Sequence, residues 1–209
     1  MKLKHKRPLD LFIITSAHIF PPLTLLWLCI WIAVPIAIWL QDRGPIFYTQ
    51  ERLGKDGRVF LIHKFRTMIP DAESMTGAIW SHKYDNRITK VGKLLRWTAL
   101  DELPQIWNIL KGDMTFVGPR SERPELHKQI IKEIPDFEKR LQVKPGLTGL
   151  AQVKGSYDLS PEEKLYYDLK YIKEASIRLD IKIILCSIWN TLLAKWSHPT
   201  TPHPPKEIN

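Results

Sequence analysis

The stretch LFIITSAHIFPPLTLLWLCIWIAVPIAIWL, residues 11–40, decides the fold of this chain. It contains no Asp, Glu, Lys or Arg, whereas the rest of the sequence is richly charged. As one straight helix it would be about 45 Å long, against a hydrocarbon core of roughly 30 Å. It is too long for the apolar part of a secretory signal and has no small-x-small cleavage site. We therefore predict a membrane segment followed by a water-facing domain.

Two adjacent prolines, Pro21 and Pro22, interrupt this apolar run. They remove two backbone donors, and Pro22 disfavours the α conformation for the residue before it, so we predict a membrane break there. A kinked span and a re-entrant helix-break-helix both satisfy the pattern. Basic residues flank both ends of the run, which favours the re-entrant form with both ends cytoplasmic. The polar residues close to the break, which are candidates to satisfy freed backbone groups, are Thr15, Ser16, His18 and Thr24.

The composition divides the chain into three parts. We predict a basic N-terminus and membrane helix over residues 1–43, one domain over residues 44–196, and a disordered Pro-rich tail over residues 197–209. A formal net charge of +9 favours nucleic acid, acidic lipid or phosphorylated substrates without choosing among them. Cys29 and Cys186 each lie in an apolar pattern, so we expect two buried free thiols and neither a disulfide framework nor a zinc site.

Residues 46–52 and 58–67 predict two strands joined at Lys55-Asp56-Gly57 as a β-hairpin. Alternation places Lys64 and Arg66 on one face of the second strand, where two cations could hold an anion. A solvated strand face is the more common outcome for such a pair. With helical patterns elsewhere, the predicted fold class is α+β: a membrane helix-break-helix, then a small helical domain with a β-hairpin and amphipathic helices.

A second helical pattern follows the pair Asp101-Glu102. Apolar residues recur at helical spacing from Leu103 to Leu110, and Pro104 must lie in the first turn. Asp101 is therefore expected at or near the N-cap, with Glu102 just inside. Acidic residues at a helix start usually satisfy free N–H groups. They are also suited to one carboxylate attacking phosphate while the other holds a divalent cation. The spacing does not decide between these interpretations.

Two Gly/Pro-containing loops carry a cation each, as phosphate-handling loops often do: Val117-Gly118-Pro119-Arg120 and Lys144-Pro145-Gly146-Leu147-Thr148-Gly149. Neither matches the P-loop or the dinucleotide-binding pattern. Ser160-Pro161-Glu162-Glu163 predicts a helix start. The last helical pattern, from Ile177 to Leu192, has an apolar face that fits either a core helix or a helix in the headgroup plane.

These motifs together resemble the bacterial sugar transferase family, the small monotopic phosphoglycosyl transferases. The resemblance covers about residues 7–193. The motifs that carry it are KFRTM (64–68), DELPQIWNILKGDM (101–114), FVGPR (116–120) and PGLTG (145–149) with Ala151-Gln152. Three positions depart from the family pattern: Ser121 replaces a proline, Leu150 replaces an aromatic residue, and Pro21-Pro22 replaces Ser-Pro, which removes a hydroxyl at the break.

The resemblance implies transfer of a phosphosugar from a UDP-sugar to polyprenyl phosphate, with release of UMP, as the first membrane step of bacterial glycan assembly. It implies a location at the cytoplasmic face of the inner membrane and the re-entrant topology. Asp101 would form a covalent phosphosugar intermediate and Glu102 would bind Mg²⁺. Candidate ligands of the substrate phosphates are Lys64, Arg66, Arg96 and Arg120, and Pro119 with Arg120 would contact the nucleotide.

Three rival functions are weighed beside this one. A membrane-anchored basic module could bind anionic lipid or nucleic acid, but the chain has no basic-aromatic stripe and no nucleic-acid motif, so we expect no nucleic acid. A membrane scaffold would leave the motifs incidental. A transferase using direct attack by the lipid phosphate would keep Asp101 only as a metal ligand. The sugar, the polyprenyl length, the glycan pathway and the oligomeric state, a homodimer included, stay open.

Overall fold

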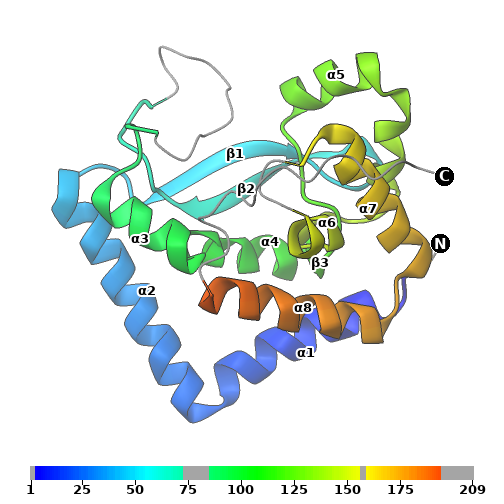
Figure 1. The fold of residues 1–209 in the computed structure, drawn as a ribbon. Coiled ribbons are helices and arrows are strands. Elements are labelled where there is room, and N and C mark those ends of the chain that lie inside the picture. The colour runs from blue at the N-terminus through cyan, green and yellow to red at the C-terminus, as the bar shows by residue number, and fades with distance from the viewer. Residues whose placement is uncertain (1–2, 73–84, 156–158, 194–209) are drawn as a thin grey trace.

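The computed structural model describes residues 3–72, 85–155 and 159–193. The predicted disordered tail, residues 197–209, and most of the polar stretch before residue 88 lie outside these ranges. Figure 1 shows two layers. A V of two N-terminal helices lies on one side, and a hairpin surrounded by short helices lies on the other.

The predicted break is confirmed. Helix α1 (Lys6–Ile19) ends at Phe20, whose extended backbone (φ −70°, ψ 111°) turns the chain into α2 (Pro21–Asp42). The outer ends of both helices lie against the domain while their junction points away from it (Figure 1), as a re-entrant hairpin requires. The hydroxyl of Thr24 donates to the carbonyls of His18 and Phe20, the latter at 3.2 Å. It therefore satisfies the His18 carbonyl, whose helical donor would be the N–H that Pro22 lacks, although the Ser of the family pattern is missing.

Helix α2 is long and apolar enough to cross a membrane, and few of its residues are buried within the protein. The expectation of two buried thiols is wrong, because Cys29 is exposed on α2 and Cys186 is half-buried on α8 (Ile177–Leu192). Both cysteines lie on helices whose apolar faces point outward, so an apolar pattern did not mean a protein interior. Both thiols are free, as predicted.

The predicted hairpin is also confirmed. Strand β1 (Phe47–Leu53) pairs antiparallel with β2 (Val59–Phe65), and Phe47 lies opposite Phe65. The 3₁₀ turn η1 (Lys55–Gly57) joins them, with Asp56 and Gly57 at positive φ (56° and 74°). These are residue types that tolerate the left-handed conformation the turn needs.

The remaining elements form the body of the domain around this hairpin. Two parallel strands, β3 (Thr115–Val117) and β4 (Gly146–Thr148), pair although nothing in the sequence predicted them. The capping box predicted at Ser160 is present. The helices and 3₁₀ segments, in chain order, are α3 (Lys90–Thr98), η2 (Leu100–Gln105), α4 (Ile106–Lys111), α5 (Pro124–Glu133), η3 (Pro135–Gln142), α6 (Leu150–Lys154), α7 (Pro161–Glu174) and α8.

The two membrane helices share the core of the domain. Ile38, near the end of α2, packs with Phe65 of β2 and Leu95 of α3. Ile14 of α1 packs with Ile62 of β2 and with Ile109 of α4. Burial of these side chains, each worth about 1.5–3 kcal/mol, fixes the arms of the V to the strands and helices above them.

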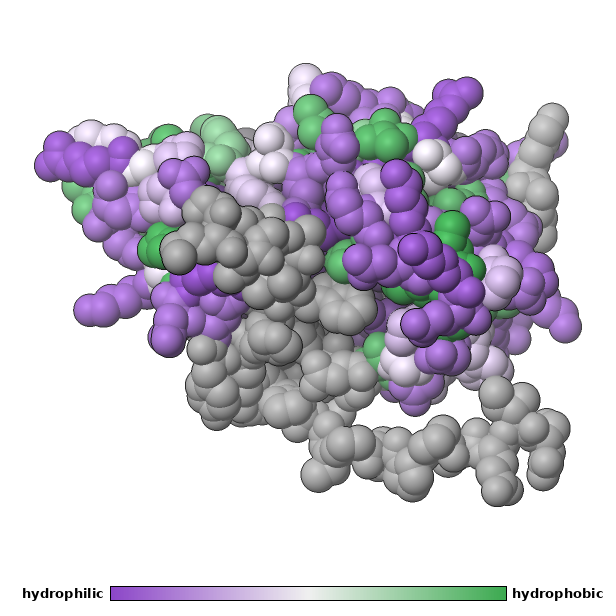
Figure 2. All heavy atoms as spheres, turned by 90° about the horizontal axis from the view of Figure 1, so that it is seen from above, coloured by the Kyte–Doolittle hydropathy of each residue, from purple (hydrophilic) through white to green (hydrophobic). Residues whose placement is uncertain are grey.

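The outer faces of the molecule differ in polarity. The face seen in Figure 2, which is opposite the V, is mostly hydrophilic. Large apolar side chains are instead exposed on α1, α2, α3, α4 and α8. On α8 the predicted apolar stripe points outward, with Leu185 61% and Ile188 53% exposed, while Ile183 is buried. Most of the predicted stripe therefore does not face the core of the domain.

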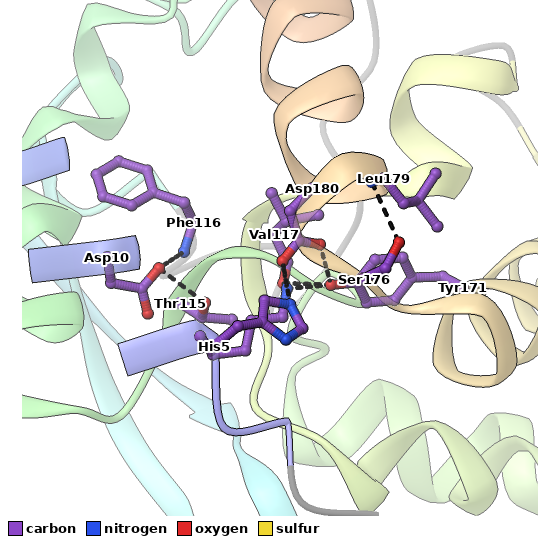
Figure 3. A network of polar contacts seen from close by, with 10 residues as sticks. His5, Asp10, Thr115, Phe116, Val117, Tyr171, Ser176, Leu179 and Asp180 are labelled. Atoms are coloured by element: carbon purple, nitrogen blue, oxygen red, sulfur yellow. Dashed lines mark hydrogen bonds and ion pairs between the residues drawn. The ribbon is translucent and has the colours of Figure 1, made fainter. Parts of the chain in front are cut away.

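A buried polar network joins the start of α1 to the opposite end of the chain (Figure 3). The ammonium of Lys6 donates to the Val117 carbonyl at 2.6 Å, forms an ion pair with Asp180 at 2.7 Å and contacts the hydroxyl of Tyr171. Asp180 is fully buried and also pairs with His5 at 2.9 Å. A basic residue that the sequence assigned to membrane topology therefore neutralises a buried carboxylate inside the domain.

We expect Lys6→Met to lower the free energy of unfolding by about 3 kcal/mol, because it leaves the carboxylate of Asp180 buried without its main counter-charge. The matched control is Lys4→Met, since Lys4 is exposed, and it should change the free energy of unfolding by less than about 0.5 kcal/mol. Thermal unfolding in detergent measures both. Equal melting temperatures for the two variants would contradict a stabilising role for the network.

Candidate active site

Asp101 and Glu102 lie in the first turn of η2. The helix begins two residues earlier than predicted, because Ala99 takes the left-handed conformation (φ 56°) and occupies the N-cap. Within the described residues, the Asp101 carboxylate accepts no hydrogen bond from a backbone N–H. Asp101 is nevertheless buried, with 8% of its surface exposed. The helix-capping interpretation of Asp101 is therefore wrong, and a buried carboxylate without a structural bond needs another explanation.

Glu102 is held by two cations from distant parts of the chain. Its Oε1 accepts from Lys64 Nζ at 2.6 Å and from Arg120 Nη2 at 3.0 Å. Lys64 comes from β2, and Arg120 follows β3. We call Asp101 and Glu102 the dyad. The predicted grouping of Lys64 and Arg120 with the dyad is therefore observed, and it places two positive charges beside adjacent carboxylates.

The two carboxyl groups have pKa values shifted in opposite directions. Burial raises the pKa of Asp101 to about 6, and the charge of Lys64 opposes this rise. Burial also acts to raise the pKa of Glu102, but Lys64 and Arg120 outweigh it and hold that pKa well below its usual range. At neutral pH both groups are ionised, and Asp101 is the more basic of the two. Opposite shifts within a pair of carboxyl groups are typical of sites that divide chemical roles.

Arg96 and Arg66 differ in their relation to the dyad. Arg96, on α3, donates from Nε to the Thr67 hydroxyl at 2.9 Å, and its charge lowers the pKa of Asp101. Arg66 points elsewhere: its Nη1 donates to Asp42 Oδ2 at 2.7 Å and to the Met68 carbonyl at 3.0 Å, and its Nη2 pairs with the other oxygen of Asp42. The structure does not bring Arg66 to the dyad, because the carboxylate at the end of α2 binds its guanidinium.

Asn108 is a residue of the site that the sequence did not reveal. It lies on α4, directly after η2, and only 1% of its surface is exposed. Its amide accepts from the His63 N–H at 3.1 Å and donates to the Leu61 carbonyl at 2.7 Å. These two bonds take the place of a neighbouring strand at the edge of β2, and so align Lys64 with the dyad. A single Asn inside a helical pattern carries no signal of such a role.

Chemically, the site offers a basic, buried carboxylate next to a charge-compensated one. No group of three or more His, Cys, Asp or Glu side chains that could hold a metal occurs within the described ranges. Two adjacent carboxylates do fit a magnesium ion that takes its other ligands from substrate phosphates and water. The arrangement therefore suits attack on a substrate phosphate whose own oxygens supply further ligands of the magnesium ion.

A family model described as "Bacterial sugar transferase" matches residues 1–194. The chain belongs to the bacterial sugar transferase family. The resemblance found from the motifs is thereby confirmed over nearly the whole length of this chain.

Three relatives illustrate what this chain is similar to. The UDP-N-acetylgalactosamine-undecaprenyl-phosphate N-acetylgalactosaminephosphotransferase of Aeromonas hydrophila is 38% identical over 187 residues, 88% of this chain and 42% of that protein. The UDP-glucose:undecaprenyl-phosphate glucose-1-phosphate transferase of Xanthomonas campestris is 38% identical over 80% of this chain and 36% of that protein. The undecaprenyl-phosphate galactose phosphotransferase of Salmonella typhimurium is 37% identical over 73% of this chain and 36% of that protein. This chain thus spans roughly two fifths of the length of these relatives.

The raised pKa of Asp101 predicts a pH-dependent stability. The folded protein holds the Asp101 proton up to about pH 6, whereas the unfolded chain loses it near pH 4, so this contribution to stability is lost as the pH rises through that window. We expect Asp101→Asn to raise the free energy of unfolding at pH 8, by up to about 3 kcal/mol, and the gain to disappear toward pH 4.

The neighbouring Glu102→Gln variant provides the matched control with the opposite sign. The fold stabilises the ionised form of Glu102, so this substitution should destabilise the protein at pH 8, and the loss should shrink only as the pH falls below about 4.5, where the unfolded chain binds the proton. Thermal unfolding of Asp101→Asn between pH 4 and pH 8, and of Glu102→Gln down to about pH 3, measures the two effects. A loss of stability in Asp101→Asn at pH 8 would contradict the burial of an ionised Asp101.

Proposed function

We propose that this chain transfers a phosphosugar from a UDP-sugar to a membrane polyprenyl phosphate and releases UMP, the first membrane step in building a bacterial glycan. The observation that carries the proposal is the buried Asp101, kept basic beside Glu102, whose carboxylate binds both Lys64 and Arg120. The names of the relatives support the same donor and acceptor classes, with N-acetylgalactosamine, glucose and galactose as different sugars.

In the proposed mechanism, a carboxylate oxygen of Asp101 attacks the phosphorus next to the sugar. A bond forms between that oxygen and the phosphorus, and the bond from the phosphorus to the bridging oxygen breaks, so UMP leaves with the electron pair. An oxygen of polyprenyl phosphate then attacks the same phosphorus and displaces the Asp101 carboxylate. A pKa near 6 suits this role, because the carboxylate is ionised at neutral pH yet more nucleophilic than an ordinary aspartate.

The cations of the site provide the electrostatic part of the mechanism. Lys64, Arg96 and Arg120 all lower the pKa of Asp101 and so lie close enough to act on charge that develops there. We propose these three as ligands of the diphosphate, with Pro119 and Arg120 at the nucleotide. Arg66 is no longer proposed, because its guanidinium binds Asp42. Fixed positive charge at the point where a phosphate gains charge is a large contribution to catalysis in a buried site.

The proposed cofactor is Mg²⁺, and the donor set fits it. Lys64 and Arg120 both bind Oε1 of Glu102, and no described residue donates a hydrogen bond to the second oxygen, Oε2. Glu102 would therefore hold the ion by Oε2 together with substrate oxygens, in keeping with the preference of Mg²⁺ for few carboxylates plus phosphate. When bound, the ion would neutralise charge on the diphosphate.

We propose a monotopic attachment with the site at the cytoplasmic face, and the exposed apolar surfaces support the attachment to a membrane. The V of α1 and α2 would enter the bilayer, and the exposed apolar residues of α8 would lie in the headgroup plane. A polyprenyl phosphate has its phosphate in the same plane. An active site held just above this plane therefore reaches the acceptor without extracting it from the lipid.

The covalent step is tested by incubating purified protein with UDP-sugars and Mg²⁺ without lipid acceptor. We expect UMP release of at most one equivalent and a phosphosugar mass on the peptide that contains Asp101. Asp101→Asn should abolish both, and Asp136→Asn, at an exposed aspartate, should leave them unchanged. UMP that appears only after polyprenyl phosphate is added would favour direct attack by the lipid, and no UMP with any UDP-sugar and acceptor would refute the transferase.

The role of α8 is tested by Leu185→Glu, which places a charge on the exposed apolar face. We expect weaker binding to lipid vesicles and slower transfer to a membrane-embedded acceptor, because the face loses apolar contact with the bilayer. Gln129→Glu adds the same charge on α5, which lies far from the V in Figure 1, and should change neither. Equal vesicle binding by both variants would mean that α8 does not touch the membrane.

A further inference from the structure

The segment from Val117, the last residue of β3, to Glu122 accepts a hydrogen bond at almost every carbonyl from a donor in another part of the fold. Arg120 lies in the middle of its loop, residues 118–122, which has no helix or strand of its own to hold it. The bonds, from donor to carbonyl, are Lys6 Nζ to Val117 at 2.6 Å, Gly146 N to Pro119 at 2.9 Å, Arg140 Nη2 to Arg120 at 2.9 Å, Arg52 Nη1 to Ser121 at 3.0 Å and Leu53 N to Glu122 at 2.9 Å.

Arg140 makes the contact at Arg120 itself. It lies in η3 with 3% of its surface exposed, and its Nε and Nη2 donate to Asp168 Oδ2 at 2.9 and 2.6 Å. The ring of Phe137 lies 4.5 Å from its guanidinium carbon. Charge, hydrogen bonds and stacking therefore fix this guanidinium in one orientation, in which Nη2 donates to the main-chain carbonyl of Arg120.

Arg52 reaches the next carbonyl from the other side of the loop. It comes from β1, and its Nη2 donates to Gln50 Oε1 at 2.6 Å. Burial, with the charge of Arg120 nearby, lowers its pKa to about 10, so it remains a cation at neutral pH. Within the described residues, no carboxylate lies within ion-pairing distance of Arg52. The Ser121 carbonyl therefore binds a half-buried cation whose charge is not cancelled by a bonded anion.

The loop also has little room to move. A Cβ placed on Gly118 would lie 2.5 Å from the Lys144 carbonyl oxygen, so the backbone packs closely against the segment that leads into β4. Fixed on both sides, the main chain sets where the Arg120 side chain begins. Its guanidinium then meets Glu102 at 3.0 Å.

We propose that Arg140 and Arg52 are positioning residues, which act on the reaction by holding the backbone on both sides of Arg120 so that its guanidinium meets Glu102 and the incoming diphosphate. The inference rests on the proposed function for its readout. Neither residue touches the dyad. Their effect on catalysis passes through Arg120, and a displacement of about 1 Å at such a group can cost on the order of 100-fold in rate.

A double-mutant cycle tests this coupling. Arg140→Lys and Arg52→Lys keep the positive charge but remove the planar guanidinium that donates to the loop carbonyls. Each substitution is made in the wild type and in the Arg120→Ala variant. In the wild type we expect each to lower kcat/KM for UMP release about 10-fold or more. In Arg120→Ala the same substitutions should change kcat/KM by less than about 2-fold, because the group they position is gone. Equal losses in both backgrounds would overturn the proposal.

Ile130→Val is the control for a purely structural effect. Ile130 packs in the same cluster as Phe137 but makes no polar contact with the loop. It should lower the melting temperature without lowering kcat/KM in either background. Because Arg52 is only half-buried, Arg52→Lys keeps the test valid if Arg140→Lys does not fold. A kcat/KM loss in Ile130→Val as large as that of Arg140→Lys would assign the effect to stability alone.

Hydrogen exchange separates failure of this inference from failure of the proposed function. If the wild type releases UMP from no UDP-sugar, the proposed function fails and the positioning role is judged by amide exchange alone. We then expect the amides of residues 117–122 to exchange at least 10-fold faster in Arg140→Lys and Arg52→Lys than in wild type or Ile130→Val. Unchanged exchange in that segment would overturn the positioning role, whatever the activity.

Discussion

Two adjacent carboxylates, the buried Asp101 and the half-buried Glu102, lie at the start of η2, and they repel each other unless cations surround them. Glu102 meets this constraint by binding Lys64 and Arg120 through one oxygen. Asp101 has no such direct bond among the described residues, so burial raises its pKa and leaves it basic. Because the cations bind Glu102, Asp101 is left as the more basic carboxylate of the pair. This division needs cations that arrive from separate elements and hold their places when substrate binds.

Much of the remaining structure can be understood as support for those cations. Lys64 is aligned by β2, whose free edge is bonded by Asn108. Arg120 depends on a loop bonded by residues of η3, β1 and α1. Helices α1 and α2 contribute directly, because Lys6 of α1 binds the Val117 carbonyl and Asp42 of α2 binds Arg66, two residues after Lys64. The N-terminal helix pair is therefore part of the scaffold of the site.

Local patterns predicted the elements well and the polar partners poorly. The break at Pro21, the hairpin and the helix start at Ser160 were predictable, because proline geometry, turn residues and capping act within a few residues. The β3–β4 pairing and the Lys6–Asp180 pair were not, since they join residues far apart in sequence. Knowledge of the dyad came from the family resemblance, because the spacing alone equally fitted a helix cap.

The cations show why residue type and spacing do not reveal a role. Lys64 and Arg66 are two residues apart on a predicted strand face, and both form charged bonds at 2.5–2.7 Å, yet their roles differ. The carboxylate partner of Lys64 belongs to the dyad, so a phosphate arriving there can share the ammonium at small cost. The partner of Arg66 is Asp42, the last residue of α2. Releasing Arg66 would leave a buried guanidinium without its counter-charge and remove a bond that fixes the end of α2. A cation is available to substrate when its existing partner already lies in the site, and only the folded chain shows which partner that is.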